Sequence, residues 1–399
     1  MAEPRPWDNR LPAELLDVVF SYLPSLADRA CCASVCKTWR TAAMWKEHEA
    51  PLLLMLSKSD AGPSCFGVFS KTSTVHPAIR ARARGARFCG SSPGGKFIVA
   101  RSQWRDYALL NIHSGEETAL PDGLLSEGHE VPFNLRVGLK PSALVILAAA
   151  VSPELNPQGD YIVAAIAAGQ HKAVFWVRGT HQWRSFEPLL ERQEFWPRLM
   201  LEEFEDVIFY GSQDERTRGF YFLTSRDGFL KFGRQYGSYG KETYVYGSGS
   251  GCRFPSPPGS GQVVAGRYLV EWCGSLLMVQ RFVSPGHGTV SFRVFTLQRS
   301  NDGRKWGWRT SPAVMMGTLL FVGRGCSRAM ATGRDRPGCI YFLDDAEGFP
   351  DVDSIIRTEK LYRCSDTGWF RRVQDADYVE KIRPEGPPPD CSPWIWFHL

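Results

Sequence analysis

The sequence predicts a mainly β protein with a small all-α module at its N-terminus. Apolar residues at helical spacing are concentrated in the first fifty or so residues. From Pro51 onward, short apolar and aromatic segments alternate with clusters of glycine, proline, serine and aspartate, which is typical of many strands joined by turns. We therefore divide the chain into a helical module at residues 1–50 and a strand-rich domain at residues 51–399.

Three short helices are expected in the N-terminal module. Pro12 suits the first turn of a helix, and Glu14 follows near the positive end of the helix dipole. Residues 25–28 fit a capping box that opens a second helix, and a third helix is expected around Trp39. One apolar stripe is formed by Leu11, Leu15, Leu16, Val19 and Leu23. Helices this short cannot bury all these groups, so apolar surface remains for a partner or for the rest of the chain.

The motif L-P-x-E-L-L at residues 11–16, followed by V-C-x-x-W-R at residues 35–40, resembles the F-box. The resemblance implies a three-helix docking module that binds the Skp adaptor and, through it, a cullin scaffold. The alternative is that the helices only cap the following domain. The positions that match the family's adaptor contacts are Leu11, Pro12, Leu15, Leu16, Val19, Val35, Cys36 and Trp39.

Composition argues against several other classes of protein. The net charge is +5, from 47 basic and 42 acidic side chains, which gives no sign of a nucleic-acid partner. The longest apolar run, residues 143–151, is too short to span a membrane, and no signal peptide is apparent. Eleven cysteines without a C-x-x-C pair favour reduced thiols in the cytoplasm or nucleus.

The strand-rich domain contains many predicted hairpins. Residues 220–222 are expected to pair with 229–232, and residues 268–270 with 276–279. A Pro-x-Gly turn precedes a strand at both Pro93 and Pro157, which suggests a degenerate repeat. Radial repetition can accommodate this many hairpins, so we expect a β-propeller, with a pair of large β-sandwiches as the alternative. Further predicted strands are residues 96–100, 161–166, 173–177, 219–224, 292–295 and 339–343.

This domain also resembles that of plant F-box proteins with a propeller-like domain long catalogued as of unknown function. The resemblance implies a propeller and the role of substrate receptor in a ubiquitin ligase, without identifying the substrate. The segments that carry it, in order, are residues 89–95, 110–115, 120–121, 206–209, 268–271, 292–295, 339–345 and 393–397.

The sequence indicates no catalytic or cofactor site and no metal site. The eight histidines are scattered without metal-ligand spacing, and the glycine-rich residues 247–251 lack the lysine of a phosphate loop. Asp344, Asp345 and Glu347 are interpreted as a turn rather than a cation site. Four tryptophans are expected in the core rather than in a substrate site: Trp183, Trp196, Trp306 and Trp308.

A basic segment at residues 80–87 is expected to be a strand, which would place Arg80, Arg82 and Arg84 on one face. We interpret this face as solvated, with nuclear targeting or an acidic partner as the alternative.

The two ends of the strand-rich domain are expected to meet. Residues 52–56 form an apolar strand without an obvious hairpin partner, and residues 394–397 form an aromatic one. Because an unpaired apolar edge promotes aggregation, we predict that both lie in the same sheet.

The sequence as a whole predicts a non-catalytic adaptor. It would be the substrate-receptor subunit of a Skp–cullin–F-box type E3 ubiquitin ligase, in which the propeller recruits a protein substrate and ligation follows from proximity. Two alternatives remain open. One is a propeller that binds a small molecule or sugar beneath a helical cap, and the other is an F-box scaffold that does not promote degradation.

Overall fold

The computed structural model describes the greater part of the strand-rich domain and short stretches of the N-terminal module. The residues described are 12, 15–16, 19, 32, 34–44, 52–55, 64–69, 71–74, 79, 82–112, 114–125, 144–153, 161–168, 172–185, 203–211, 217–233, 235–236, 242–243, 261–299, 306–311, 317–331, 338–345, 365–373, 376–382 and 392–397.

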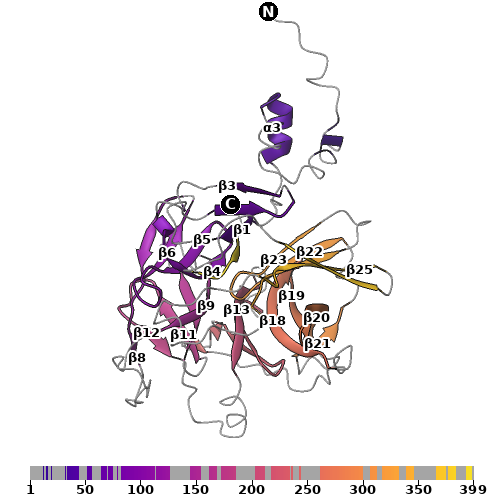
Figure 1. Ribbon diagram of the computed structural model, residues 1–399. Coiled ribbons are helices and arrows are strands. Elements are labelled where there is room, and N and C mark those ends of the chain that lie inside the picture. The colour runs from indigo at the N-terminus through magenta and orange to yellow at the C-terminus, as the bar shows by residue number, and fades with distance from the viewer. Residues whose placement is uncertain are drawn as a thin grey trace, which may run out of the picture.

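Six β-sheets in the described part of the chain follow one another around a ring (Figure 1). The first, the closure sheet, has the order β27 (Ile395–Phe397), β1 (Leu52–Met55), β2 (Ser64–Gly67) and β3 (Thr72–Thr74). The second sheet has the order β4 (Arg87–Ser92), β5 (Lys96–Ala100), β6 (Tyr107–Asn111) and β7 (Glu117–Ala119). The third has the order β8 (Leu124–Leu125), β12 (Trp183–Ser185), β11 (Lys172–Val177), β10 (Ile162–Ala167) and β9 (Ile146–Val151).

The other three sheets complete the ring. The fourth has the order β13 (Phe204–Tyr210), β14 (Gly219–Thr224) and β15 (Phe229–Phe232). The fifth has the order β18 (Val263–Trp272), β19 (Ser275–Ser284), β20 (Gly288–Arg299) and β21 (Trp306–Thr310). The sixth has the order β23 (Arg328–Ala331), β22 (Thr318–Val322), β24 (Cys339–Phe342), β25 (Gly368–Val373) and β26 (Ala376–Lys381). A separate two-stranded sheet pairs β16 (Gln235–Tyr236) with β17 (Glu242–Thr243).

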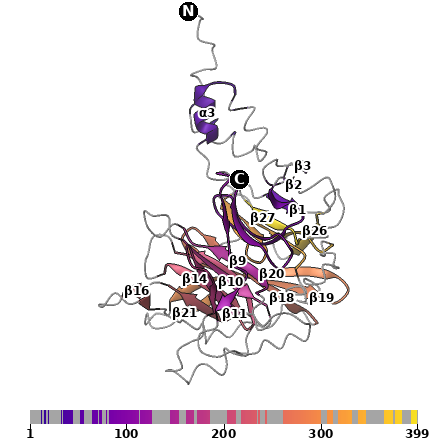
Figure 2. The ribbon, with the colours of Figure 1, turned by 90° about the vertical axis from the view of Figure 1, so that its left-hand side faces the viewer.

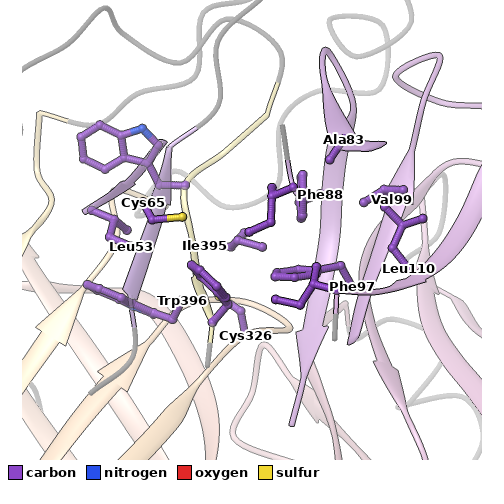
Figure 3. Close-up of a cluster of buried hydrophobic side chains, with 14 of the residues drawn as sticks. Leu53, Cys65, Ala83, Phe88, Phe97, Val99, Leu110, Cys326, Ile395 and Trp396 are labelled. Atoms are coloured by element: carbon purple, nitrogen blue, oxygen red, sulfur yellow. The ribbon is translucent and has the colours of Figure 1, made fainter. Parts of the chain in front are cut away.

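Apolar side chains fill each space between neighbouring sheets. Separate clusters join the second sheet to the third, the third to the fourth, the fourth to the fifth, and the fifth to the sixth. A further cluster joins the sixth, closure and second sheets (Figure 3). Each of the six sheets is therefore covered by neighbouring sheets, and together they form a closed ring. This architecture confirms the predicted propeller and replaces the sandwich alternative.

The closure sheet joins the two ends of the domain, as predicted. Strand β1 is antiparallel to β27, with Leu53 opposite Trp396. The Trp396 indole, which is fully buried, donates a hydrogen bond of 3.0 Å to the carbonyl of Val322 in the sixth sheet. Its ring also packs edge-on against Phe321, with centroids 5.2 Å apart. The C-terminal strand is therefore a structural part of the ring.

Both predicted hairpins are present. Phe222 lies opposite Leu230 in the fourth sheet, and Tyr268 lies opposite Val279 in the fifth. The other predicted strands correspond to β5, β10, β11, β14, β20 and β24. Short apolar runs separated by turn-forming residues were therefore sufficient to locate these strands.

The strand predicted around residues 80–87 is wrong in its first part. Arg82 lies in a helical turn and Arg84 in the turn that follows, whereas Arg80 lies outside the described residues. Ile79 and Ala83 are both buried in the closure cluster. They are four residues apart, a spacing that places them on one helical face and the arginines elsewhere. Burial of this short apolar pair explains why the segment is helical.

Candidate functional site: the N-terminal helices and the ring they stand on

Most of the described residues of the N-terminal module are helical, namely residues 15–16, 19, 32 and 37–44. The carbonyl of Pro12 accepts hydrogen bonds from the amides of Leu15 and Leu16, at 3.0 and 3.2 Å, which forms the first turn. Helix α3 spans Lys37–Met44, and its first turn is closed by a 2.9 Å bond from the Arg40 amide to the Cys36 carbonyl. Both views show α3 standing away from the ring, on the side of the closure sheet (Figures 1 and 2).

The predicted adaptor-contact residues differ in exposure. Leu15 is 51% exposed and Val35 53% exposed, which is unusual for large apolar side chains. Val19, Cys36 and Trp39 are half-buried. Each of these five residues therefore keeps part of its side chain exposed to solvent.

The remaining predicted contacts are exposed, fully buried or outside the described residues. Pro12 is exposed, whereas Leu16 is fully buried and packs within the chain. That Leu16 contacts the adaptor stays a prediction. Leu11 and Glu14 lie outside the described residues, as does the module boundary near residue 50.

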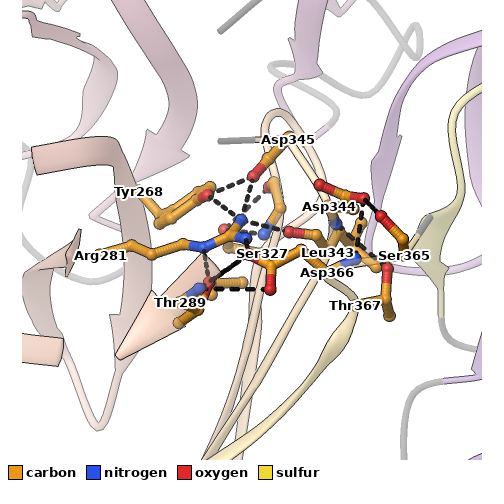
Figure 4. Close-up of polar contacts among 12 residues, drawn as sticks. Tyr268, Arg281, Thr289, Ser327, Leu343, Asp344, Asp345, Ser365, Asp366 and Thr367 are labelled. Carbon is orange, nitrogen blue, oxygen red and sulfur yellow. Dashed lines mark hydrogen bonds and ion pairs between the residues drawn. The ribbon is translucent and has the colours of Figure 1, made fainter. Parts of the chain in front are cut away.

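A buried arginine ties the fifth sheet of the ring to the sixth (Figure 4). The guanidinium of Arg281, on β19, is fully buried and bonds the Asp366 carboxylate at 2.5 Å and that of Asp345 at 3.0 Å. It also donates to the Thr289 hydroxyl at 2.7 Å and to the carbonyl of Leu343. Each charge in the group therefore has a partner, as a buried charge requires.

The acidic cluster predicted near residue 345 is part of this network. Asp344 accepts a 2.8 Å hydrogen bond from the amide of Asp366, and burial raises its pKa although Arg281 opposes the effect. Residues 343–345 form a bend after β24, which agrees with the interpretation as a turn, and Glu347 lies outside the described residues. Within the part of the chain that is described, no three His, Cys, Asp or Glu side chains are grouped as metal ligands.

A buried carboxylate joins three parts of the ring near its centre. Asp206, on β13, accepts hydrogen bonds from its neighbour Val207 at 2.9 Å, from Leu269 of the fifth sheet at 2.8 Å, and from Gly325 at 2.7 Å. Burial raises the pKa of Asp206 to about 7, although these three amide donors favour the ionised form.

The turn at residues 323–327, after β22, reaches across the ring. Besides its bond to Asp206, Gly325 accepts a 2.9 Å hydrogen bond from the amide of Ser91 in the second sheet. A Cβ atom on Gly90 would lie 2.1 Å from the carbonyl oxygen of Ala149 in the third sheet, so two inner strands approach through their backbones. The backbones of these inner segments are therefore in close contact, with no room for a side chain at Gly90.

Two of the four predicted core tryptophans are fully inside the ring. Trp183 and Trp308 are 0% and 3% exposed, and both indole nitrogens donate to backbone carbonyls. Trp306 is half-buried, and Trp196 lies outside the described residues. The prediction that these side chains belong to the core is confirmed for the first pair.

Sequence reasoning did not single out Arg281 or Asp206. Each lies in a strand otherwise rich in apolar residues, and a charged residue at a position whose neighbours are buried is the signal that could have identified them. Most partners of both residues come from distant parts of the chain, among them Asp366 for Arg281 and Gly325 for Asp206, so the sequence alone could not pair them.

None of the helices described is long and apolar enough to cross a membrane.

Comparisons with known families match both parts of the chain. Residues 65–371, more than half of the sequence, match the family model of the KIB1-4 beta-propeller. Residues 8–48 match the F-box-like model. No curated protein matches this chain.

Similar solved structures have low sequence identity. An exo-beta-1,3-galactanase from Phanerochaete chrysosporium is 10% identical with a TM-score of 0.32, over 78% of this chain and 59% of that one. An exo-beta-1,3-galactanase from Clostridium thermocellum is 11% identical with a TM-score of 0.34, over 86% and 62%. The Cps50 (Swd1) beta-propeller domain from Myceliophteria thermophila is 8% identical with a TM-score of 0.32, over 80% and 90%. The chain thus spans less than two thirds of both galactanases, and scores this low carry no functional argument.

Proposed function

The chain belongs to the KIB1-4 beta-propeller family and carries an F-box-like segment, and from this architecture we propose that it is the substrate-receptor subunit of a Skp–cullin–F-box ubiquitin ligase. F-box-like domains generally mediate binding to the Skp adaptor. The cullin would be reached through that adaptor, and the propeller would hold a protein client. The complex would act in the cytoplasm or the nucleus.

The observation that carries the proposal is the exposure of Leu15 and Val35 on the N-terminal helices. Both side chains match positions where the F-box contacts its adaptor, and both are more than half exposed in the free chain. Burying such side chains against a partner stabilises the complex by about 25 cal/mol for each Å² of apolar surface that is removed from water. Trp39, a third predicted contact, is half-buried and is an aromatic residue of the kind enriched at binding hot spots.

We propose that the chain has no catalytic role of its own. In this mechanism the helices fix the propeller to the scaffold, so that a lysine of the client is held close to the charged conjugating enzyme. Ligation is then favoured by effective concentration.

The docking step can be tested with purified proteins. The full chain is titrated with a recombinant Skp adaptor, and the double variant Leu15→Ala/Val35→Ala is compared with Val263→Ala, an exposed valine of the fifth sheet. We expect the double variant to bind at least tenfold more weakly, because hot-spot truncations cost about 2 kcal/mol or more, and the control to bind like the wild type. Full-strength binding by the folded double variant would reject the proposal.

The ligase step needs a separate measurement. The chain is recovered from cells with and without proteasome inhibition, and cullin peptides and ubiquitinated clients are quantified by mass spectrometry. Clients that accumulate only under inhibition support a degradative receptor. Cullin without accumulating clients indicates a scaffold.

A further inference from the structure

The hairpin β25–β26 of the sixth sheet has two different faces. Phe370 is buried in the cluster between the fifth and sixth sheets, and Val379 packs against the same cluster. The opposite face carries Trp369, Arg371 and Val373 along β25, since side chains alternate along a strand. Figure 1 shows β25 reaching the outer edge of the ring. One face of the hairpin therefore stabilises the ring, and the other face is left at the rim.

The outer face exposes large apolar and aromatic side chains. Tyr378 of β26 lies opposite Arg371, is 54% exposed, and has Val373, which is 38% exposed, as its diagonal neighbour. Trp369 is half-buried at the inner end. We call Trp369, Arg371, Val373 and Tyr378 the rim strip. Tryptophan, tyrosine and arginine are the residue types most enriched at protein-binding hot spots.

Arg371 gives the rim strip a charge preference. Its Nε atom is buried without a hydrogen-bond acceptor, and no ion pair of Arg371 is present among the described residues. The neighbouring Arg372, on the other face, is neutralised by Asp377 at 2.5 Å. In the described part of the chain no carboxylate pairs with the Arg371 guanidinium, whose neighbours along the same face of β25 are Trp369 and Val373. Such a guanidinium favours a carboxylate, which it can bind through two parallel hydrogen bonds.

Two further features restrict the charge and the backbone conformation of the partner. Glu380 lies opposite Trp369 on the same face, so a run of acidic residues would be repelled at the inner end. In the described part of the chain β26 pairs only with β25, which leaves its outer edge without a strand partner. An extended segment would place alternate side chains along the strip with the same period as the strand.

We propose that the rim strip is the client-docking surface of the propeller, and that it takes an extended protein segment with a single acidic residue between apolar ones. The inference rests on the proposed receptor function and specifies where and by what chemistry the client binds.

The test uses the full chain bound to its adaptor and a displayed library of random dodecapeptides. We expect selection to enrich peptides with one Asp or Glu flanked by aliphatic or aromatic residues. The best of these, made synthetically, should bind at least about tenfold more weakly to Arg371→Glu and to Tyr378→Ala. The matched controls are Arg309→Glu and Val263→Ala, exposed residues of the fifth sheet, and these should bind like the wild type.

Changing the peptide tests the charge directly. Replacing its acid with lysine should abolish binding to the wild type and restore part of the binding to Arg371→Glu. The rim-strip assignment is overturned if the peptides bind all four variants equally, or if the selected peptides have no acidic residue. In either case adaptor binding is measured on the same samples, so that failure of the docking surface is distinguished from failure of the receptor function.

Discussion

Leucine and tryptophan side chains differ in burial between two regions of this protein, the closure sheet and the N-terminal helices. In the closure sheet, Leu53 and Trp396 are fully buried. In the N-terminal helices, Leu15 is 51% exposed and Trp39 half-buried. The residue types are the same, but the closure sheet lies between two other sheets, whereas a few short turns of helix have too little volume to cover their own side chains. Burial in this protein therefore depends on how many elements surround a residue.

The comparison predicts the largest loss of stability at the closure sheet. Replacing Trp396 with alanine removes its contacts with Phe321 and its hydrogen bond to Val322. We expect the free energy of unfolding to fall by about 3–5 kcal/mol, as for other buried aromatic truncations. Urea unfolding measures it, with the half-buried Trp306→Ala as control. An equal loss in both variants would contradict a special role for the closure sheet.

The second test asks whether polar ties between sheets matter as much as apolar ones. The change Arg281→Leu leaves the carboxylates of Asp345 and Asp366 without their buried partner. We expect a loss of roughly 3 kcal/mol, because Asp345 loses its ionic partner, although Asp366 retains Lys381. Removing one member of a buried pair leaves the other charge uncompensated. The control is Arg372→Leu, which breaks an exposed pair with Asp377 and should cost at most about 1 kcal/mol.

The third test sharpens the comparison within the helical module. Leu15 and Leu16 are adjacent, but the first is exposed and the second is fully buried. We expect Leu15→Ala to change the free energy of unfolding by less than about 0.5 kcal/mol and to weaken adaptor binding by about 2 kcal/mol. Leu16→Ala should reduce the stability of the module instead. Titration calorimetry and amide exchange measure the two effects, and the reverse pattern would show that exposure does not mark the docking surface.

The last test measures a pH dependence at the buried carboxylate of Asp206. Burial raises the pKa of Asp206 to about 7 in the folded chain, above its ordinary value of 3.8, so the folded state binds the proton more tightly than the unfolded state. Stability from this group is fully present below pH 3.8 and is lost as the pH rises toward 7, with a slope of at most about 1.4 kcal/mol per pH unit.

The variant Asp206→Asn isolates this contribution. We expect the free energy of unfolding of the wild type, measured relative to the variant, to decrease between pH 4 and pH 7. Urea unfolding at several pH values gives the difference, and groups common to both proteins cancel. A difference that rises over this interval would show that the three amide donors, rather than burial, set the pKa.

The sequence by itself determined the local elements and the nature of the two regions. Apolar runs between turn-forming clusters located strands such as β14 and β19. The apolar ends of the domain predicted that β1 and β27 lie in the same sheet, where the structure pairs them. The motif at residues 11–16 and 35–40 indicated the F-box-like module, which the family comparison matches. These features depend on the period and order of neighbouring residues, which the sequence shows directly.

Only the tertiary structure decided which side chains are covered and which charges meet. Burial of Ile79 and Ala83 against the closure sheet makes residues 82–83 helical, against the strand that the alternating arginines predicted. The partners of Arg281 lie 64 and 85 residues away, and Gly325 reaches Asp206 from 119 residues away. A pattern of neighbouring residues contains no information at such separations, because the contacts exist only once the sheets have closed into a ring.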